Sequence, residues 1–372
     1  TQLGEVEVIA QKKNPAFRIL QEIQNHRIQN DPRELEAYEC EVYNKLQFDL
    51  SNIGENFENN KLIKKFNFIS DYADTLNGKD YLPVLLSESV SNYYFKNSPQ
   101  QKKEVITATQ VTGIDNLQLG QFTGDMYQNV NIYDNFIGLF GKDFLSPIAP
   151  TGRAFYKYYL MGEDTIEGQL CYHLMFRPRR EGDGAFIGDI WITDSTYAVK
   201  RVIAEIPDNV NINYISSFKV EQNFNFIDST VWIVTNEKVF AEFKLFNEFK
   251  TQKLLGVYVR KTTSRNKITI NKPHDFDFYT SDVELSDSAS NRSNEYWDMA
   301  RHDSLSNQES GVISMVDSLK KNKRFKFYDN ISYMGYTGFW KAGPIEIGNI
   351  FSVYNKNAVE GHRLMLSLRT SN

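Results

Sequence analysis

The stretch YECEVYNKLQFDL, residues 38–50 of this 372-residue chain, decides the fold. Its apolar and charged side chains alternate, so that each kind falls on its own face of an extended backbone. A period of two predicts a strand with one face in the core and the other in water. We expect one face to bury Tyr38, Val42, Leu46 and Phe48, and the other to expose Glu39, Glu41 and Asp49.

The same alternation returns in FKVEQNFNF, residues 218–226, whose buried face is expected to hold Phe218, Phe224 and Phe226. The tripeptide Asp-Ser-Thr stands between alternating runs at 194–196 and again at 228–230. Asp and Ser favour turns because their side chains bond to nearby backbone, so both tripeptides predict hairpins. The chain is therefore expected to be mainly β, in the α+β class, with a long, curved antiparallel sheet. Further strand-like runs cover 82–95, 103–112, 153–161, 169–177, 185–193, 197–206, 230–237, 239–246 and 254–262.

A helical insert is expected near 117–146, where apolar residues recur at gaps of three and four. Such a helix would have to cover the apolar face of the sheet, because otherwise a large apolar patch would be exposed. A sheet covered in this way encloses either a filled core or a groove, and the sequence leaves both open. The candidate groove consists of Tyr38, Val42, Leu46, Phe48, Phe122, Met126, Tyr133, Ile137, Phe140, Phe218, Phe224 and Phe226.

Composition excludes several functions. A net charge of -5 and a pI near 5.7 argue against a nucleic-acid partner. The scattered histidines form no metal-ligand motif and no nucleophile or nucleotide motif is present, so we expect no catalytic residue, no metal and no cofactor. Cys40 and Cys171 are expected to be buried free thiols, with a single disulfide between them as the alternative.

The densest guanidinium cluster of the strand region is formed by Arg177, Arg179 and Arg180. Guanidinium groups bind phosphates and carboxylates through paired hydrogen bonds, so a lipid headgroup is a natural ligand here. The alternative is a solvated loop.

The residue composition changes after residue 280. Residues 281–330 are expected to be a polar linker followed by a helix, and 331–372 the entry into a membrane β-barrel. Leu364, Leu366 and Leu368 alternate with polar residues, as in a strand that faces lipid on one side. With no signal peptide at Thr1, the chain looks like an excised segment that continues past Asn372, whose barrel-like end would be isolated here.

Several stretches together resemble large outer-membrane proteins of Bacteroidota-type bacteria. These stretches are LGEVEVIA (3–10), NPAFRILQEIQNHRIQND (14–31), CYHLMFRPRR (171–180) and GDIWITDSTYAVKRV (188–202). Such proteins join a carboxypeptidase-regulatory-like sandwich, a domain of unknown function and a C-terminal barrel. The resemblance implies that 1–12 end the sandwich and that 13–280 form a β-rich periplasmic domain. The strand and hairpin GDIWITDSTYAVKRV is also similar to the half-barrel of LolA-type lipoprotein carriers.

The resemblance implies a non-catalytic module at the outer membrane, mainly in the periplasm, that binds a lipid, a lipoprotein or an outer-membrane protein. Its partners would then be the outer membrane, its lipids and other envelope proteins. A purely structural docking domain is the alternative, and a hydrolase is a remote one. An open, aromatic-lined cleft would favour binding, a close-packed interior would favour docking, and a converging Ser–His or carboxylate pair would favour a hydrolase.

Overall fold

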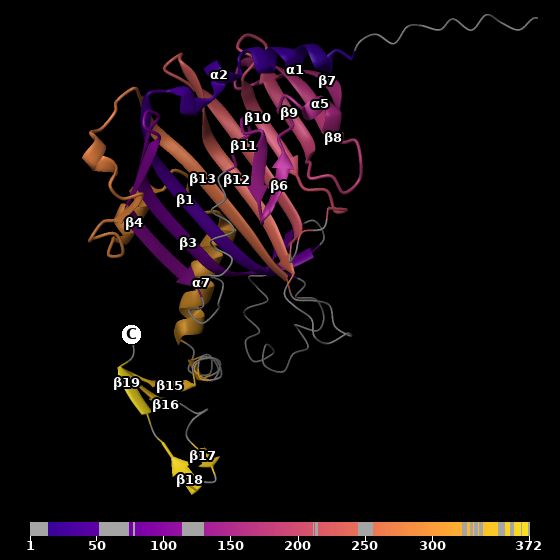
Figure 1. The fold of residues 1–372 in the computed structure, drawn as a ribbon. Coiled ribbons are helices and arrows are strands. Elements are labelled where there is room, and N and C mark those ends of the chain that lie inside the picture. Colours follow the sequence, from indigo (N-terminus) through magenta and orange to yellow (C-terminus); the bar gives the residue numbers. More distant parts are fainter. Residues whose placement is uncertain are drawn as a thin grey trace, which may run out of the picture.

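A twelve-stranded sheet organises the computed structural model (Figure 1). The model describes residues 14–51, 74–76, 79–113, 130–210, 212, 215–244, 256–321, 326–327, 330, 334, 338–348, 354–357, 361–365 and 367–370. In spatial order the strands are β14 (Val283–Leu285), β4 (Gln101–Gly113), β3 (Lys79–Lys96), β1 (Ala37–Ser51), β13 (Gly256–Ile270), β12 (Val231–Lys244), β11 (Ile215–Ile227), β10 (Val199–Glu205), β9 (Ile187–Thr193), β8 (Gln169–Pro178) and β7 (Tyr156–Ile166), while β2 (Asp74–Leu76) pairs with β3.

The strand pairing confirms the predicted fold class. Strands β7 to β13 follow one another as an antiparallel meander, and β1 is inserted between β13 and β3. Both Asp-Ser-Thr tripeptides connect neighbouring strands, as predicted, and Asp228 and Ser229 have the positive φ angles that a tight hairpin turn requires. Among the strands that the structure describes, only β14 runs parallel to its neighbour, β4.

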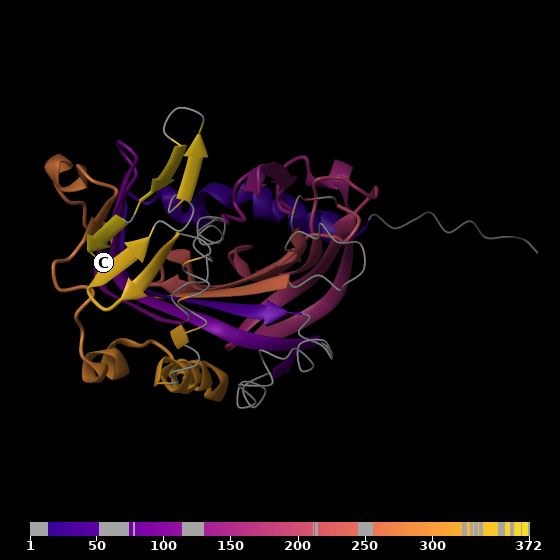
Figure 2. The same ribbon diagram turned by 90° about the horizontal axis from the view of Figure 1, so that it is seen from below.

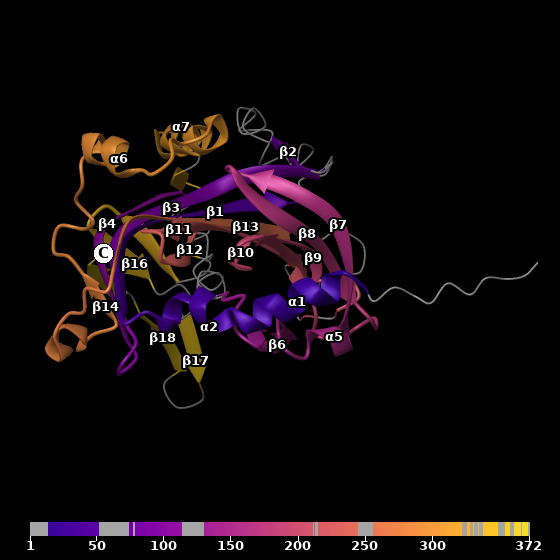
Figure 3. The ribbon, with the colours of Figure 1, turned by 90° about the horizontal axis from the view of Figure 1, so that it is seen from above.

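The sheet is curved, and its two faces carry different covers (Figures 2 and 3). The inner face is covered by the short helices α1 (Ala16–Asn25), α2 (Arg27–Asn30) and α5 (Gly152–Phe155) and by the hairpin of β5 (Phe136–Leu139) and β6 (Lys142–Leu145). Helix α1 contributes one apolar stripe at helical spacing to the core, made of Ala16, Ile19, Leu20 and Ile23.

The predicted helical insert is wrong over residues 130–145, where the structure has a non-helical segment at 130–135 and then the β5–β6 hairpin at 136–145. Phe140 and Gly141 form its two-residue turn with φ angles of 51° and 73°. Ile137 and Phe144 pair across the two strands and face the core together, which reproduces a helical spacing by coincidence. Covering of the sheet is nevertheless observed, because Phe140 packs against Phe218 with ring centroids 5.4 Å apart. Phe122 and Met126 lie outside the described residues.

The outer face is wet only in part, which corrects the expectation for Asp49. Its side chain is fully buried and forms an ion pair with Arg260 at 2.6 Å, while Glu39 and Glu41 keep partial exposure. Helices α6 (Asn294–Ala300) and α7 (Asn307–Lys321) lie on this face (Figure 3). Trp297 of α6 forms a second apolar cluster there with Tyr43, Val90 and Ala108 of the sheet.

Phe226 is a second correction, because 43% of its surface is exposed. It stands one residue before the end of β11, beside the 228–230 turn, and stacks on Trp232 with centroids 5.1 Å apart. An alternating pattern does not show where a strand extends beyond the segments that cover it. The burial of Phe226, near the end of β11, was therefore overestimated.

The segment after residue 280 contains more regular structure than a linker. It holds β14, the short helix α6 and the longer α7, which contacts β3 and β4. Beyond α7 lie a three-stranded sheet of β15 (Phe339–Ala342), β16 (Ile345–Gly348) and β19 (Ser367–Thr370) and a hairpin of β17 (Tyr354–Asn357) and β18 (Gly361–Leu364), apart from the main sheet (Figure 1). Leu364 and Leu368 are exposed, and Leu366 lies outside the described residues. The membrane entry stays a prediction; none of the helices in the described ranges is long and apolar enough to span a membrane.

Candidate binding cavity

A cavity of about 470 Å³ opens at one end of the inner face, between the strands and the loop that follows α2. Its volume lies within the range of small-molecule sites. Strands β1, β3, β4, β11, β12 and β13 supply most of the wall. The lining residues are Pro32, Arg33, Tyr38, Tyr93, Phe95, Gln100, Gln101, Lys102, Val130, Asn131, Gln222, Phe224, Ile233, Val234, Glu237, Arg265, Tyr279 and Asp282.

Aromatic rings form one wall of this cavity. Tyr38 on β1 lies 5.2 Å from Phe95 and 5.9 Å from Tyr93, measured between ring centroids. Desolvation raises the pKa of both Tyr38 and Tyr93, although neither ring is fully covered by protein atoms. All three rings line the cavity, so they offer a ligand an aromatic surface.

Arg265 supplies a positive charge to the same space. It stands on β13 opposite Val42, and its Nη1 donates one long hydrogen bond of 3.4 Å to the Val234 carbonyl. Within the described part of the chain no carboxylate lies within ion-pair distance of it. It lines the same cavity as Tyr38 and Tyr93, and its charge partly offsets the desolvation that raises the pKa of both phenols. A half-buried guanidinium without a carboxylate is suited to an anionic ligand group.

Gln222 provides a buried acceptor that lacks a donor. Only 1% of the residue is exposed, and its Nε2 donates to the carbonyl of Val130 and to Glu237, both at 2.6 Å. Because both of these partners are acceptors, the orientation of the amide is fixed. Its Oε1 has no hydrogen-bond partner, and neither does Oε1 of Gln101 in the same lining. Leaving a buried acceptor unpaired costs about 1–3 kcal/mol, so each such atom calls for a partner.

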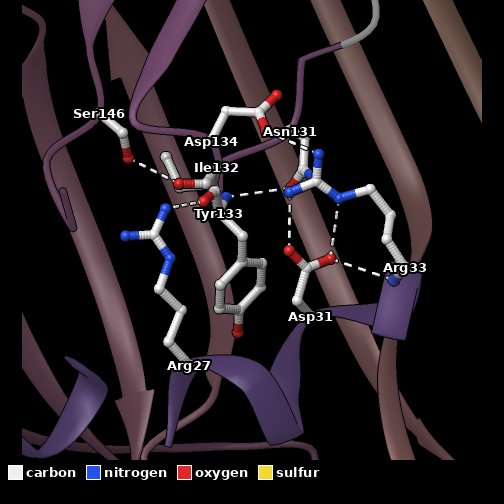
Figure 4. Close-up of polar contacts among 8 residues, drawn as sticks. All are labelled: Arg27, Asp31, Arg33, Asn131, Ile132, Tyr133, Asp134 and Ser146. Carbon is white, nitrogen blue, oxygen red and sulfur yellow. Dashed lines mark hydrogen bonds and ion pairs between the residues drawn. The ribbon is translucent and has the colours of Figure 1, made fainter. Parts of the chain in front are cut away.

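The rim of the cavity is held by a polar network between α2 and residues 131–134 (Figure 4). Arg33 pairs with Asp31 and with Asp134, each at 2.7 Å, and its pKa is raised chiefly by the hydrogen bond to Asp31. Arg27 donates to the Tyr133 carbonyl, which ties the helix to the same segment. Because Arg33 is already neutralised by two carboxylates, it positions the rim. Among the described lining residues, Lys102 and Arg265 are cations without such a partner; Lys102 is exposed and Arg265 is half-buried.

Only some of the predicted groove residues line the cavity, and the others lie in the core. Tyr38 and Phe224 line the cavity, while Leu46, Phe48, Ile137 and Phe218 belong to the filled core. Val42 is buried, Tyr133 packs against Phe224 with centroids 6.3 Å apart, and Phe140 is partly buried against the core. Most of the inner face is thus close-packed, and open space is found at one end. Whether these residues contact a ligand stays a prediction.

The predicted headgroup cluster lies away from the cavity. Arg177, on β8, donates to the Tyr159 hydroxyl at 2.6 Å, and Arg179 donates to the Arg153 carbonyl at 3.0 Å. Arg180 is exposed in the following loop. Strand β8 stands next to the β7 edge of the sheet, whereas the cavity is built on β1, β3 and β11 to β13. The fold therefore does not bring these arginines to the aromatic wall.

One Ser–His–Glu array escaped sequence reasoning. Ser264 Oγ lies 2.7 Å from His302 Nδ1, and His302 Nε2 lies 3.3 Å from Glu41. Ser264 is 4% exposed and the array lies on the outer face, outside the cavity lining. A substrate could not reach this hydroxyl, so the array fastens the chain after α6 to the sheet. No cluster of three or more metal-binding side chains converges in the described ranges.

The chain belongs to a family of unknown function, DUF5686, whose model matches residues 19–261. That match runs from α1 into β13 and covers most of the cavity lining, while Arg265, Tyr279 and Asp282 lie beyond its end. No curated protein matches the chain.

Three bacterial proteins of known structure are similar to the chain. A DUF1329 family protein from Desulfovibrio piger is 11% identical, with 72% of this chain and 98% of that chain covered and a TM-score of 0.30. A putative outer membrane lipoprotein-sorting protein domain from Vibrio parahaemolyticus is 7% identical, with 71% and 97% covered and a TM-score of 0.29. A LolA superfamily protein from Nitrosomonas europaea is 8% identical, with 72% and 98% covered and a TM-score of 0.24. Similarity this loose does not carry a ligand or an activity over, so function has to be argued from this chain's own geometry.

Proposed function

We propose that this chain is a non-catalytic binding module that holds an amphiphilic molecule in the cavity at the end of its inner face. The observation that carries the proposal is the combination of an aromatic wall with the unpaired guanidinium of Arg265 in one enclosed space. An amphiphile offers an apolar part to the rings and a polar part to the cation. We further propose that the module works at the outer membrane, facing the periplasm, as the sequence resemblance implies.

The close packing of the core leaves the end of the inner face as the place where a ligand can bind. Leu46, Phe48 and Phe218 are at most 3% exposed, so the middle of the inner face has no room for an acyl chain. A packed interior of this kind would also suit a docking domain. A docking domain, however, has no use for a cavity with a half-buried cation that lacks a carboxylate partner, because such a group costs stability.

The test is to fill the cavity and measure lipid binding. Val234→Trp, on β12, places an indole into the lining without removing a polar group. We expect the unaltered chain to bind lysophospholipids in equilibrium dialysis, and Val234→Trp to weaken this binding at least tenfold. Tenfold corresponds to about 1.4 kcal/mol, a modest loss for a blocked site.

The matched control is Val111→Trp. Val111, on β4, is 63% exposed and lies outside the cavity lining, so this variant adds the same indole to the surface. It should bind as the unaltered chain does. Equal binding by both variants and the unaltered chain, or no binding by any of them, would contradict the proposal.

A further inference from the structure

The outer face of the sheet is covered by helices at one end and carries exposed cations at the other. Helices α6 and α7 lie over β1, β3 and β4, whereas β7 and β8 form the opposite end of the sheet (Figure 3). At that end lie five exposed cationic residues, which we call the basic corner. They are Arg153 of α5, Lys157 of β7, Arg177 of β8, and Arg179 and Arg180 directly after β8.

Strand pairing and hydrogen bonds bring most of these cations together. Lys157 and Arg177 stand directly opposite each other on β7 and β8, so their side chains lie on the same face of the sheet. The backbone N–H of Arg179 donates to the Phe155 carbonyl at 2.7 Å, and its side-chain Nε donates to the Arg153 carbonyl at 3.0 Å. Like charges that stand opposite each other destabilise a sheet, so this arrangement gains stability from an anionic partner.

No carboxylate within the described residues forms an ion pair with the basic corner. Asp189, on the neighbouring strand β9, instead pairs with His173 at 2.8 Å. The loop after Arg180 contributes the acids Glu181 and Asp183, fewer than the five cations beside them. The corner therefore keeps an excess of positive charge in a chain whose net charge is -5, and such a patch attracts anions.

Apolar surface lies between these charges. Phe155, at the end of α5, is 41% exposed. Ile187 of β9 is 40% exposed and stands beside Arg177 in the register of β8 and β9. The Arg177 guanidinium lies 5.1 Å from the centroid of the Tyr159 ring and donates to its hydroxyl at 2.6 Å. Cations mixed with exposed aromatic and aliphatic side chains are typical of surfaces that bind lipid headgroups.

We infer that the basic corner is a docking surface for a bilayer that contains anionic phospholipids. Guanidinium groups match two phosphate oxygens, and a negatively charged membrane attracts clustered Lys and Arg. Phe155 and Ile187 reach the boundary between headgroups and acyl chains. An acidic protein surface would pair with the cations but offers no apolar layer to these two residues, so a membrane fits better. The inference goes beyond the proposed function, because the basic corner lies outside the cavity lining.

The experiment is co-sedimentation of the full chain with vesicles. One set of vesicles is phosphatidylcholine alone, and the other holds equal parts of phosphatidylcholine and phosphatidylglycerol. We expect binding to the second set only. Raising the salt from about 0.15 M to about 1 M shortens the Debye length from about 8 Å to about 3 Å, so this binding should weaken at least tenfold.

Exposed residues supply the variants. Arg177→Gln combined with Arg179→Gln should weaken vesicle binding at least tenfold, because one Lys or Arg at a membrane surface contributes roughly fivefold in affinity. Phe155→Ser should weaken it at least threefold. The matched control is Lys238→Gln combined with Lys267→Gln, on β12 and β13, which changes the net charge equally and should leave binding unchanged. Circular dichroism checks that each variant keeps the fold, and the salt dependence needs no variant.

The results separate this inference from the proposed function. Val234→Trp, which fills the cavity, should bind vesicles as the unaltered chain does, so a loss of lysophospholipid binding alone leaves the docking surface standing. Equal binding to both sets of vesicles, no binding to either, or unchanged binding in the double arginine variant would overturn the inference. Soluble polyglutamate that binds as tightly as the anionic vesicles, with no effect of Phe155→Ser, would also overturn it and indicate an acidic protein instead.

Discussion

At the scale of single residues, burial determines the reactivity of the two cysteine thiols. Cys40 on β1 and Cys171 on β8 are both buried and free, in agreement with the sequence interpretation. Five strands separate β1 from β8 in the sheet, so the alternative disulfide is not formed. Burial raises the pKa of each thiol from 9.0 to about 11.

The first prediction concerns these thiols. At pH 8 a thiol with a pKa of about 11 is roughly one part in a thousand thiolate, so neither cysteine should react with a disulfide reagent on a timescale of minutes. In guanidinium chloride both should react fully. Rapid labelling of the native protein at pH 8 would contradict the burial of Cys40 or of Cys171.

Stability should consequently fall at alkaline pH. The folded pKa of Cys40 lies above its unfolded value, so below pH 9 both states keep the proton and nothing changes. As the pH rises from 9 to 11 the unfolded state loses its proton first, and the free energy of unfolding falls by roughly 2 kcal/mol for this thiol. Denaturant titrations at pH 8 and pH 11 measure the loss, which Cys40→Ala should reduce. A protein that gains stability over this range would contradict the assignment.

The residues of the candidate site were only partly predictable. The alternation of 38–50 and 218–226 correctly put Tyr38 and Phe224 on the inner face. Arg265 and Gln222 escaped because isolated polar residues in strands look solvated, and because their proximity depends on the register of β1, β13, β12 and β11 across the sheet. Sequence spacing carries no information on such long-range pairing.

At the scale of elements, the strands could be predicted from the sequence, but the segments that cover the two faces of the sheet could not. In β11, buried residues alternate with partly exposed ones because one face of the strand packs against the core. The segment 130–145 failed because a hairpin with a two-residue turn can mimic helical spacing. The outer-face cover by α6 was missed, since the polar texture of 281–310 hides the single Trp297 that anchors it.

The hairpin offers a prediction with an internal control. Ile137 on β5 is 2% exposed and packs in the core, so Ile137→Asp should lower the free energy of unfolding by about 4 kcal/mol. Phe136, the preceding residue on the same strand, is 60% exposed, and Phe136→Asp should cost less than about 1 kcal/mol. Guanidinium denaturation followed by circular dichroism compares them. Equal effects would mean that β5 does not cover the sheet as described.

At the scale of the whole molecule, the curved sheet separates packing from binding. Its inner face is filled along most of its length and open at one end, where β1, β3 and β11 to β13 meet the loop after α2. The arrangement gives a rigid wall and a rim fixed by Arg33, so the site is largely preformed. Leu364 on β18 and Leu368 on β19 are exposed apolar residues beyond α7, away from the cavity lining.

The most direct measurement therefore maps where a bound lipid lies. A lysophospholipid with a diazirine next to its glycerol is bound to the full chain and photo-activated, and the modified peptides are identified by mass spectrometry. The account predicts labels on β1, β3 and β12, near Tyr38, Phe95 and Val234, and their loss in Val234→Trp. Labels confined to β17, β18 and β19, or unchanged labelling in Val234→Trp, would contradict it.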